Sequence, residues 1–337
     1  MAPAEQYGYA VARLRAMSGR LLEEALLLRI LECEDLESAV KILGETVYSG
    51  WLMELKSAGE FDRAIEAELL HVFDEVHKFV PDPALVELCR LAYDFHNVKV
   101  LLKGALLLRE GGQRRFDLLT KLGNIPTDDL ITAMETEDYR LLPFGLHRLV
   151  PRCFSVWEQS KDVLEIEKLL DEGLFAAMKL KAAESGIDSA VLWVRARIDG
   201  ENVRSLLRLK RMNVDTAAAA GYLHAGGHIS KEKLLSLFSE PAESWGKLLA
   251  FAGVSSVLAG VHDGQDLSGT VAGLEKVLDE YVAGVLESSK YDAFAPGNVM
   301  SFLWRKELET KNLRIALVSV SNNTDRTLAR GLFRHVG

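Results

Sequence analysis

The sequence predicts an all-α protein built from three similar helical domains around a pseudo-threefold axis. Two observations carry this prediction. One helical motif returns three times at domain-sized spacing, and apolar residues recur with the period of a helix along most of the 337 residues. No stretch shows the sustained alternation of apolar and polar residues that is typical of a sheet.

The repeated motif places one asparagine in an apolar helical stripe. Its first copy is YDFHNVKVLL, over residues 93–102, and its asparagine recurs 105 and then 110 residues further on. An acid precedes each asparagine by three residues, and a base follows it by two. The motif residues are Asp94, Asn97, Lys99, Asp199, Asn202, Arg204, Glu309, Asn312 and Arg314.

These asparagines are expected to be buried and to have a specific hydrogen-bond partner. An amide buried without one costs about 1–3 kcal/mol, and the preceding acid is the candidate partner. We interpret the motif as an architectural contact that each unit reuses. A direct functional role for the three asparagines is the alternative.

The helices follow in order from the N-terminus. Residues 5–30 have apolar side chains at helical spacing and are predicted to form one long helix. A second signature, L-x-x-E-x-L, is then expected to open a short helix with an acid in its first turn. An acid there is stabilising because the N-terminal end of the helix dipole is positive. Its three matches are Leu31, Glu34 and Leu36; Ile125, Asp128 and Leu130; and Ile229, Glu232 and Leu234.

A longer helix precedes each copy of the asparagine motif. The predicted ranges are 61–80, halted by Pro81-Asp82-Pro83, then 163–184 and 274–288. Glycines at 111–112, 123 and 226–227 mark the expected turns. The order of elements is therefore the same three times.

These elements divide the chain into unit one over residues 31–122, unit two over 123–226 and unit three over 227–337. Unit three lacks its closing helix, which the N-terminal helix 1–30 is expected to supply. A closed threefold arrangement places both termini in one unit in this way. A solenoid would instead have polar caps at its two ends and shorter repeats.

Composition excludes several classes of protein. The net charge of −9 argues against a nucleic-acid binder, because such proteins must neutralise phosphates. The longest uncharged apolar run, residues 248–261, is shorter than the roughly 20 residues needed to span a bilayer. No secretory signal is visible, and the three cysteines fit reduced thiols of a cytoplasmic protein.

Charge is unevenly distributed along the chain. Residues 32–75 hold twelve acids and three bases, whereas Arg208, Lys210 and Arg211 form a basic helix end. Such runs are usually solvated helix faces, and the alternative is a docking surface for a partner of opposite charge. The three basic residues are therefore the candidates for partner binding.

No catalytic, cofactor-binding or metal site is expected. The chain contains no nucleotide-binding loop, nucleophile elbow or zinc-protease motif. His224 and His228 are four residues apart, but Gly226 and Gly227 between them favour a turn over a chelating helix. His96 is interpreted as a packing or surface residue.

At YDFHNVKVLLKGALL, with YGYAVARLRAM near the start and the triplicated plan, the sequence resembles the C subunit of V/A-type ATPases and ATP synthases, the counterpart of the eukaryotic d subunit. The resemblance implies a funnel of three helical domains with a central opening. It also implies a non-catalytic rotor part between the central stalk subunits D and F and the membrane proteolipid ring, peripheral on the cytoplasmic side and serving proton or sodium transport. It implies no cofactor, nucleic acid or small-molecule substrate.

Two other functions compete with this one. A helical scaffold or adaptor recruiting other partners would bind neither shaft nor ring. A helical enzyme is disfavoured because no polar cluster converges on one part of the sequence.

Overall fold

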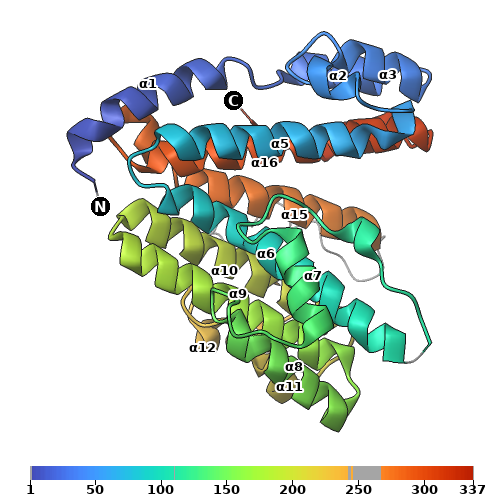
Figure 1. The fold of residues 1–337 in the computed structure, drawn as a ribbon, viewed down its shortest axis with the longest axis vertical. Helices are drawn as coiled ribbons and strands as arrows, with labels where there is room; N and C mark the ends of the chain where they lie inside the picture. The colour runs from blue at the N-terminus through green and yellow to red at the C-terminus, as the bar shows by residue number, and fades with distance from the viewer. Residues whose placement is uncertain (1, 110, 242–243, 246–266, 337) are drawn as a thin grey trace. The chain divides into compact units, whose positions relative to one another are not determined.

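The structure, a computed structural model, describes residues 2–109, 111–241, 244–245 and 267–336 (Figure 1). Every regular element in these ranges is a helix, which confirms the predicted all-α class. The longer helices are α1 (Tyr7–Ser18), α5 (Phe61–Phe79), α6 (Ala84–Arg109), α8 (Leu146–Ser160), α9 (Val163–Ser185), α10 (Asp188–Arg211), α15 (Leu267–Gly284) and α16 (Gly297–Ser321). The shorter ones include α2 (Glu24–Leu31), α3 (Leu36–Leu43), α4 (Ser49–Leu52), α7 (Thr127–Thr136), α11 (Thr216–Ala220), α12 (Lys231–Ser239) and α17 (Arg326–Gly331).

The chain divides into two compact units. One contains Asp82–Ile187, and the other combines Met1–Pro81 with Asp188–Gly337. The boundaries fall directly before α6 and α10, two of the helices that carry the asparagine motif. The second unit therefore joins the two ends of the chain.

Local chemistry accounts for the helix ends. Helix α5 ends at Phe79, before the two prolines at positions 81 and 83. Asp162 caps α9 by accepting a hydrogen bond from the Leu164 amide, and Gly186 ends the same helix at φ 65°. The long helices predicted at 61–80 and 163–184 are confirmed, and α15 covers most of the one predicted at 274–288.

The prediction of one helix over residues 5–30 is wrong. Helix α1 ends at Ser18 and α2 begins at Glu24. Between them the amide of Leu22 is bound by the Glu309 side chain at 2.7 Å, so this backbone group is not available to a continuous helix. Apolar spacing continues through the break because both helices bury side chains against the same neighbour, α16.

The L-x-x-E-x-L signature opens a helix in two of its three matches. Helices α7 and α12 begin two residues after Ile125 and Ile229, with Asp128 and Glu232 in their first turns. The match at Leu31 fails, because Leu31 ends α2 and the next helix starts only at Leu36. Leu22 lies two residues before the start of α2, so it has the position that the two isoleucines have before α7 and α12.

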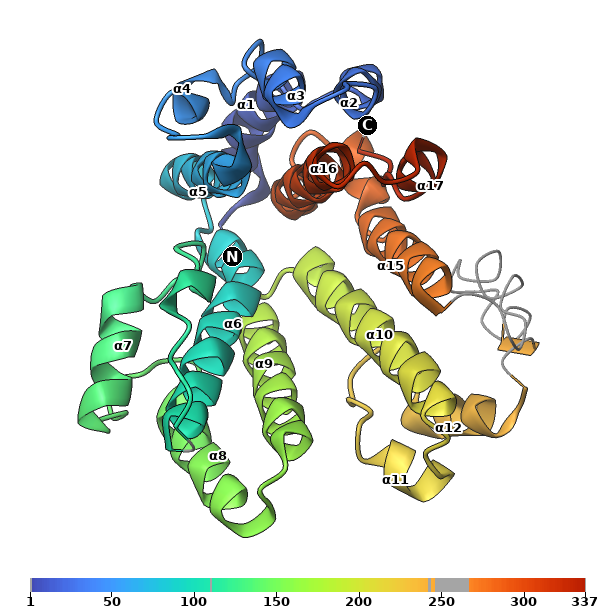
Figure 2. The ribbon, with the colours of Figure 1, turned by 90° about the vertical axis from the view of Figure 1, so that its right-hand side faces the viewer.

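Each helix that carries a motif asparagine packs against one of the long helices that precede a motif copy. For the first two copies this is the next such helix along the chain. Helix α6 packs on α9, and α10 packs on α15 (Figure 2). The last motif helix, α16, packs on α5, the first long helix of the chain, and the two run alongside each other in Figure 1. The order of these pairings is therefore cyclic.

Helix α16 and the N-terminal part of the chain share a hydrophobic core. Leu313, Leu317 and Phe333 pack with buried residues from the N-terminal 22–65 stretch, among them Leu31 and Ile65. Fully burying such a side chain contributes about 1.5–3 kcal/mol, so the two ends of the chain stabilise each other.

No helix in the described ranges is long and apolar enough to span a bilayer. The apolar run at 248–261 lies outside the described residues.

Candidate functional site

Each motif asparagine binds a backbone segment that returns to its helix 22 or 23 residues further along the chain. Nδ2 of Asn97 donates to the Thr120 carbonyl at 2.8 Å, and its Oδ1 accepts from the Thr120 amide at 2.9 Å. The same pair of bonds joins Asn202 to His224 at 2.9 and 2.7 Å, and Asn312 to Arg334 at 2.8 Å for both. We call this pair of bonds the asparagine clasp.

The clasp explains why the residue is an asparagine. A primary amide offers one donor and one acceptor side by side, as a peptide group does, and so satisfies both backbone groups of the residue it faces. All three asparagines are buried, as predicted. The predicted partner is wrong, however, because the acid three residues earlier binds elsewhere.

In the first copy the acid binds the start of the next helical segment. Oδ1 of Asp94 accepts from the Ile125 amide at 2.8 Å, and Oδ2 accepts from Nδ2 of Asn124 at 2.7 Å. Burial raises the pKa of Asp94 to about 6, and these hydrogen bonds only partly oppose that rise. Clasp and carboxylate together hold both ends of the returning segment.

The second copy repeats this arrangement. Oδ1 of Asp199 accepts from the Ile229 amide at 3.0 Å, and Oδ2 accepts from the His228 amide at 2.9 Å. The Nδ1 atom of His228 also lies 3.0 Å from Oδ2 of Asp199. His224 meanwhile contributes its backbone to the clasp. The two histidines therefore serve the repeat, and no metal-ligating cluster occurs in the described ranges.

A glycine makes room for each aspartate. A Cβ atom at Gly123 would lie 2.5 Å from Oδ1 of Asp94, and one at Gly227 would lie 2.1 Å from Oδ1 of Asp199. Both distances are too short for any side chain without movement of the carboxylate. These two glycines, predicted only as turns, are required by the buried acids.

In the third copy the other end of the chain supplies the partner. Oε2 of Glu309 accepts from the Leu22 amide at 2.7 Å. Its Oε1 accepts from the Tyr48 hydroxyl and from Nζ of Lys306, both at 2.7 Å. Burial, followed by the charge of Glu309, raises the pKa of Tyr48 well above its usual value. Leu22 thus occupies the place that Ile125 and Ile229 hold in the other copies.

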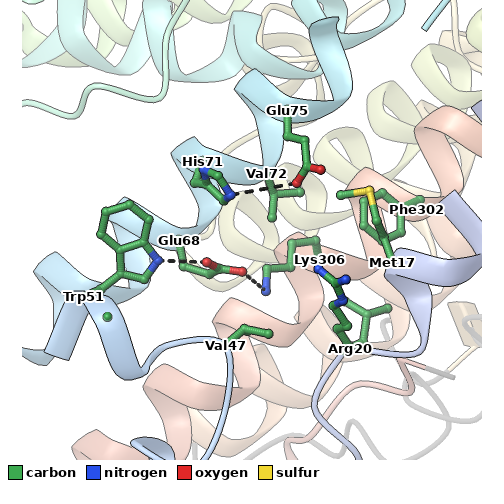
Figure 3. Close-up of a pocket in the computed structure, with 12 residues that line it drawn as sticks. Met17, Arg20, Val47, Trp51, Glu68, His71, Val72, Glu75, Phe302 and Lys306 are labelled. Atoms are coloured by element: carbon green, nitrogen blue, oxygen red, sulfur yellow. Dashed lines mark hydrogen bonds and ion pairs between the residues drawn. The ribbon is translucent and has the colours of Figure 1, made fainter. Parts of the chain in front are cut away.

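The third copy also contains a buried ion cluster that crosses from α16 to α5 (Figure 3). Nζ of Lys306 lies 3.1 Å from Oε1 of Glu68, and Oε2 of Glu68 accepts from Nε1 of Trp51 at 2.8 Å. Lys306 and Glu68 line a pocket of about 380 Å³, together with Arg20 and His71. With Glu309, the cluster has two carboxylates around one buried ammonium.

The sequence pattern does not predict three residues of this cluster, which are Tyr48, Glu68 and Lys306. Lys306 had a detectable signal, because it precedes Glu309 by three residues on one helix, a spacing at which opposite charges meet. Glu68 had none, since it is one of many acids on an amphipathic helix.

The motif bases connect the packed helix pairs. Lys99 on α6 lies 3.1 Å from Asp171 on α9, and Arg314 on α16 lies 2.8 Å from Asp62 on α5. Arg204 on α10 lies 3.7 Å from Glu275 on α15 and also pairs with Glu201 on its own helix. These pairs are partly exposed, so each contributes at most about 1 kcal/mol. Their recurrence shows that the three helix pairs share one design.

Comparison with known proteins shows which family the chain belongs to. The model of the family "ATP synthase (C/AC39) subunit" matches residues 10–332. The chain belongs to the ATP synthase (C/AC39) subunit family. It is 25% identical over 328 residues to the C subunit of the A-type ATP synthase of Methanocaldococcus jannaschii, covering 91% of this chain and 81% of that protein. It is 23% identical over 314 residues to the C subunit of the V-type sodium ATPase of Enterococcus hirae, covering 92% of both.

As a member of the C/AC39 family, the chain is a non-catalytic subunit of an A/V-type rotary ATPase. The geometry agrees with that role, because every motif residue is engaged in holding helices together. His96, beside the first clasp, is exposed and has its Nε2 atom 3.0 Å from the Leu118 carbonyl.

The three candidate partner-binding residues of this C/AC39 chain differ in availability. Arg208 is exposed and makes no side-chain hydrogen bond, ion pair or ring contact with the described residues. Lys210 donates to the Phe238 carbonyl at 2.6 Å at the end of α12 and lies over the Phe238 ring. Arg211 is half-buried and engaged in a further interaction. Arg208 is therefore the one of the three free to meet a partner.

Much of the acidic charge of residues 32–75 is neutralised within the same compact unit. Bases outside this region pair with Glu32, Glu45, Asp62, Glu68 and Glu75, and Arg63 within it pairs with Glu60. Several of those bases lie on α16 and α17, so the acids help to join the two ends of the chain.

Proposed function

We propose that this C/AC39 protein is the socket of the rotor, joining the central stalk subunits D and F to the membrane proteolipid ring. It would lie peripherally on the cytoplasmic side of the membrane, held there by the ring, and serve proton or sodium transport. The observation that carries the proposal is the cyclic order of helix pairing, in which α16 closes on α5. A part that transmits torque without chemistry must be stiff, and a buried clasp and a buried, hydrogen-bonded acid hold the backbone of each copy in place.

We further propose three units around a pseudo-threefold axis. In place of the predicted boundaries at 31–122, 123–226 and 227–337, we propose units that begin at α6, α10 and α16, on the basis of the helix pairs α6 with α9, α10 with α15 and α16 with α5. The third unit is then completed by the N-terminal part of the chain, through the Leu22–Glu309 bond and the shared core.

Spin labels test this arrangement. Positions 107, 212 and 322 each lie ten residues after a motif asparagine and are exposed. Pairwise distances between labels on Leu107→Cys, Met212→Cys and Asn322→Cys should be similar in a closed arrangement. In a row of units, one distance would approach the sum of the other two. Cys33→Ser removes the half-buried native thiol. The other two native thiols, Cys89 and Cys153, are buried, and burial raises the pKa of the Cys153 thiol to about 11, so both should label slowly.

A bridging experiment tests the socket function. A tagged D and F pair is immobilised, and detergent-solubilised proteolipid ring is added with or without the C/AC39 protein. The ring should be retained only when this protein is present. Its failure to bind either partner would favour a scaffold with other partners.

Arg208 can be tested in the same assay. Arg208→Glu should weaken binding to one of the two partners, because complementary charge steers and orients such contacts. Arg330→Glu, which makes the same charge change at an exposed position of α17, is the matched control. Unchanged affinity of Arg208→Glu for both partners would remove this end of α10 from the interface.

A further inference from the structure

Two tryptophans and two cations form a cluster where α10 meets α16. The rings of Trp193 and Trp304 lie edge to face, with centroids 5.9 Å apart. The guanidinium carbon of Arg197 lies 5.1 Å from the centroid of Trp193 and 5.0 Å from that of Trp304. The ammonium of Lys311 is also 5.0 Å from the Trp304 centroid. Both cations therefore lie against aromatic faces, where they are attracted by the ring quadrupole.

The cluster has donors that lack acceptors. Nε1 of Trp304 donates to the Asp279 carbonyl at 3.0 Å. Nε1 of Trp193, in contrast, is buried and has no acceptor in the described part of the chain. The half-buried Arg197 likewise has no hydrogen-bond acceptor or carboxylate among the described residues. An unsatisfied buried indole N–H is uncommon in folded proteins and calls for a missing partner.

The cations of the cluster differ in their carboxylate partners. Lys311 lies 2.7 Å from Oδ1 of Asp279, and Arg334 lies 3.0 Å from Oδ2 of the same carboxylate. Buried Glu307 is the second acid close enough to affect Lys311. Asp279 therefore pairs with both Lys311 and Arg334, whereas the partly buried Arg197 has no carboxylate partner among the described residues.

We propose that Arg197, held against the rings of Trp193 and Trp304, binds a carboxylate or a similar oxyanion. The planar guanidinium presents paired N–H donors that match the two oxygens of a carboxylate, and stacking on the tryptophans holds its orientation. The unsatisfied Trp193 N–H belongs to a ring that Arg197 contacts, so it can report on a ligand bound there. Such a ligand would pair with the Arg197 charge, which no carboxylate among the described residues meets.

The carboxylate has two possible sources, a free anion or an acidic side chain of another protein of the rotor. The second source rests on the proposed socket function. Binding of a free anion does not depend on that function, so the two sources can be tested separately.

The Trp193 indole N–H provides the readout. The resonance is assigned in the nitrogen–proton spectrum of the full chain by its loss in Trp193→Phe. Sodium acetate and inorganic phosphate are then titrated against sodium chloride at equal ionic strength, and the D and F pair and the solubilised ring are added in turn. A saturable shift with acetate or phosphate supports a free anion, and a shift only with the D and F pair or the ring supports a partner's side chain. Absence of a shift with all four overturns the proposal.

Two variants at neighbouring arginines make the test specific. Arg197→Gln removes the charge and should weaken the ligand that shifts Trp193 by about tenfold or more. Arg195→Gln removes the same charge from an exposed position two residues away on α10 and should leave the titration unchanged. Equal behaviour of the two variants overturns the assignment to Arg197. Retention of the other four indole resonances shows that each variant is folded.

Discussion

The asparagine clasp acts at the scale of a single residue. One side chain satisfies both backbone groups of Thr120, His224 or Arg334, and a buried acid three residues before each asparagine makes a second set of contacts. Substitutions that change one atom of the amide therefore test the role directly.

Asn202→Asp keeps the acceptor for the His224 amide but replaces the donor Nδ2 with an oxygen. That oxygen would face the His224 carbonyl at the present 2.9 Å, inside a buried site. We expect the free energy of unfolding to fall by about 2–3 kcal/mol at pH 7.5. Urea unfolding followed by tryptophan fluorescence measures this, with the exposed Asn322→Asp as the control. A loss no larger than that of the control would show that the clasp is dispensable.

Asp94 predicts a dependence of stability on pH. Its pKa of about 6 in the folded protein lies above the usual 3.8, so the folded state binds the proton more tightly. This contribution is fully present below pH 4 and is lost as the pH rises to 6, by on the order of 3 kcal/mol. Carbon NMR of the Asp94 carboxyl should give a midpoint near 6, and Asp94→Asn should remove this part of the pH profile. A midpoint near 4 would contradict the prediction.

At the scale of elements, the pairs α6 with α9, α10 with α15 and α16 with α5 use one plan with different chemistry. In the first two copies an aspartate and a glycine fit closely. The third has Glu309, whose longer side chain reaches the Leu22 amide and also joins Lys306 and Glu68. The contact between the chain ends therefore includes a buried ion cluster that the other two copies lack.

Lys306→Met tests this cluster. The change leaves Glu68 and Glu309 buried without their shared cation, and removing one partner of a buried pair costs about 3–5 kcal/mol. The measured quantity is the midpoint of urea unfolding. Lys161→Met, at an exposed residue paired with Glu158, should change stability by less than about 1 kcal/mol. A similar small effect for Lys306→Met would mean that the cluster does not stabilise the α5–α16 contact.

At the scale of the whole molecule, one compact unit is a continuous segment and the other is not. Residues 82–187 contain both partners of their clasp and their own packed helices α6, α8 and α9. The C-terminal segment 188–337 instead depends on N-terminal residues for much of the core around α16.

This difference predicts how fragments behave. The fragment 82–187 should fold alone with high helix content by circular dichroism. The fragment 188–337 should be less helical and less stable alone, because Leu313 and Leu317 lose their cover, and should gain structure when fragment 1–81 is added. The fragment 82–187, added in place of 1–81, is the control. Full cooperative folding of 188–337 without its partner would contradict the prediction.

The sequence alone determined that the protein is all-α and that its asparagine motif occurs three times. These features depend on periodicity and on identical residues at fixed offsets, which are local. The residues of the first motif copy also show the resemblance to the family.

Only the tertiary structure decided what each motif residue binds. The clasp partners lie 22 or 23 residues from their asparagines, and Leu22 lies 287 residues from Glu309. No residue pattern marks Leu22 for this role, because the contact uses its backbone N–H, which nearly every residue has. For that reason the sequence pattern does not predict the break between α1 and α2, and it places the signature at Leu31 and not at Leu22.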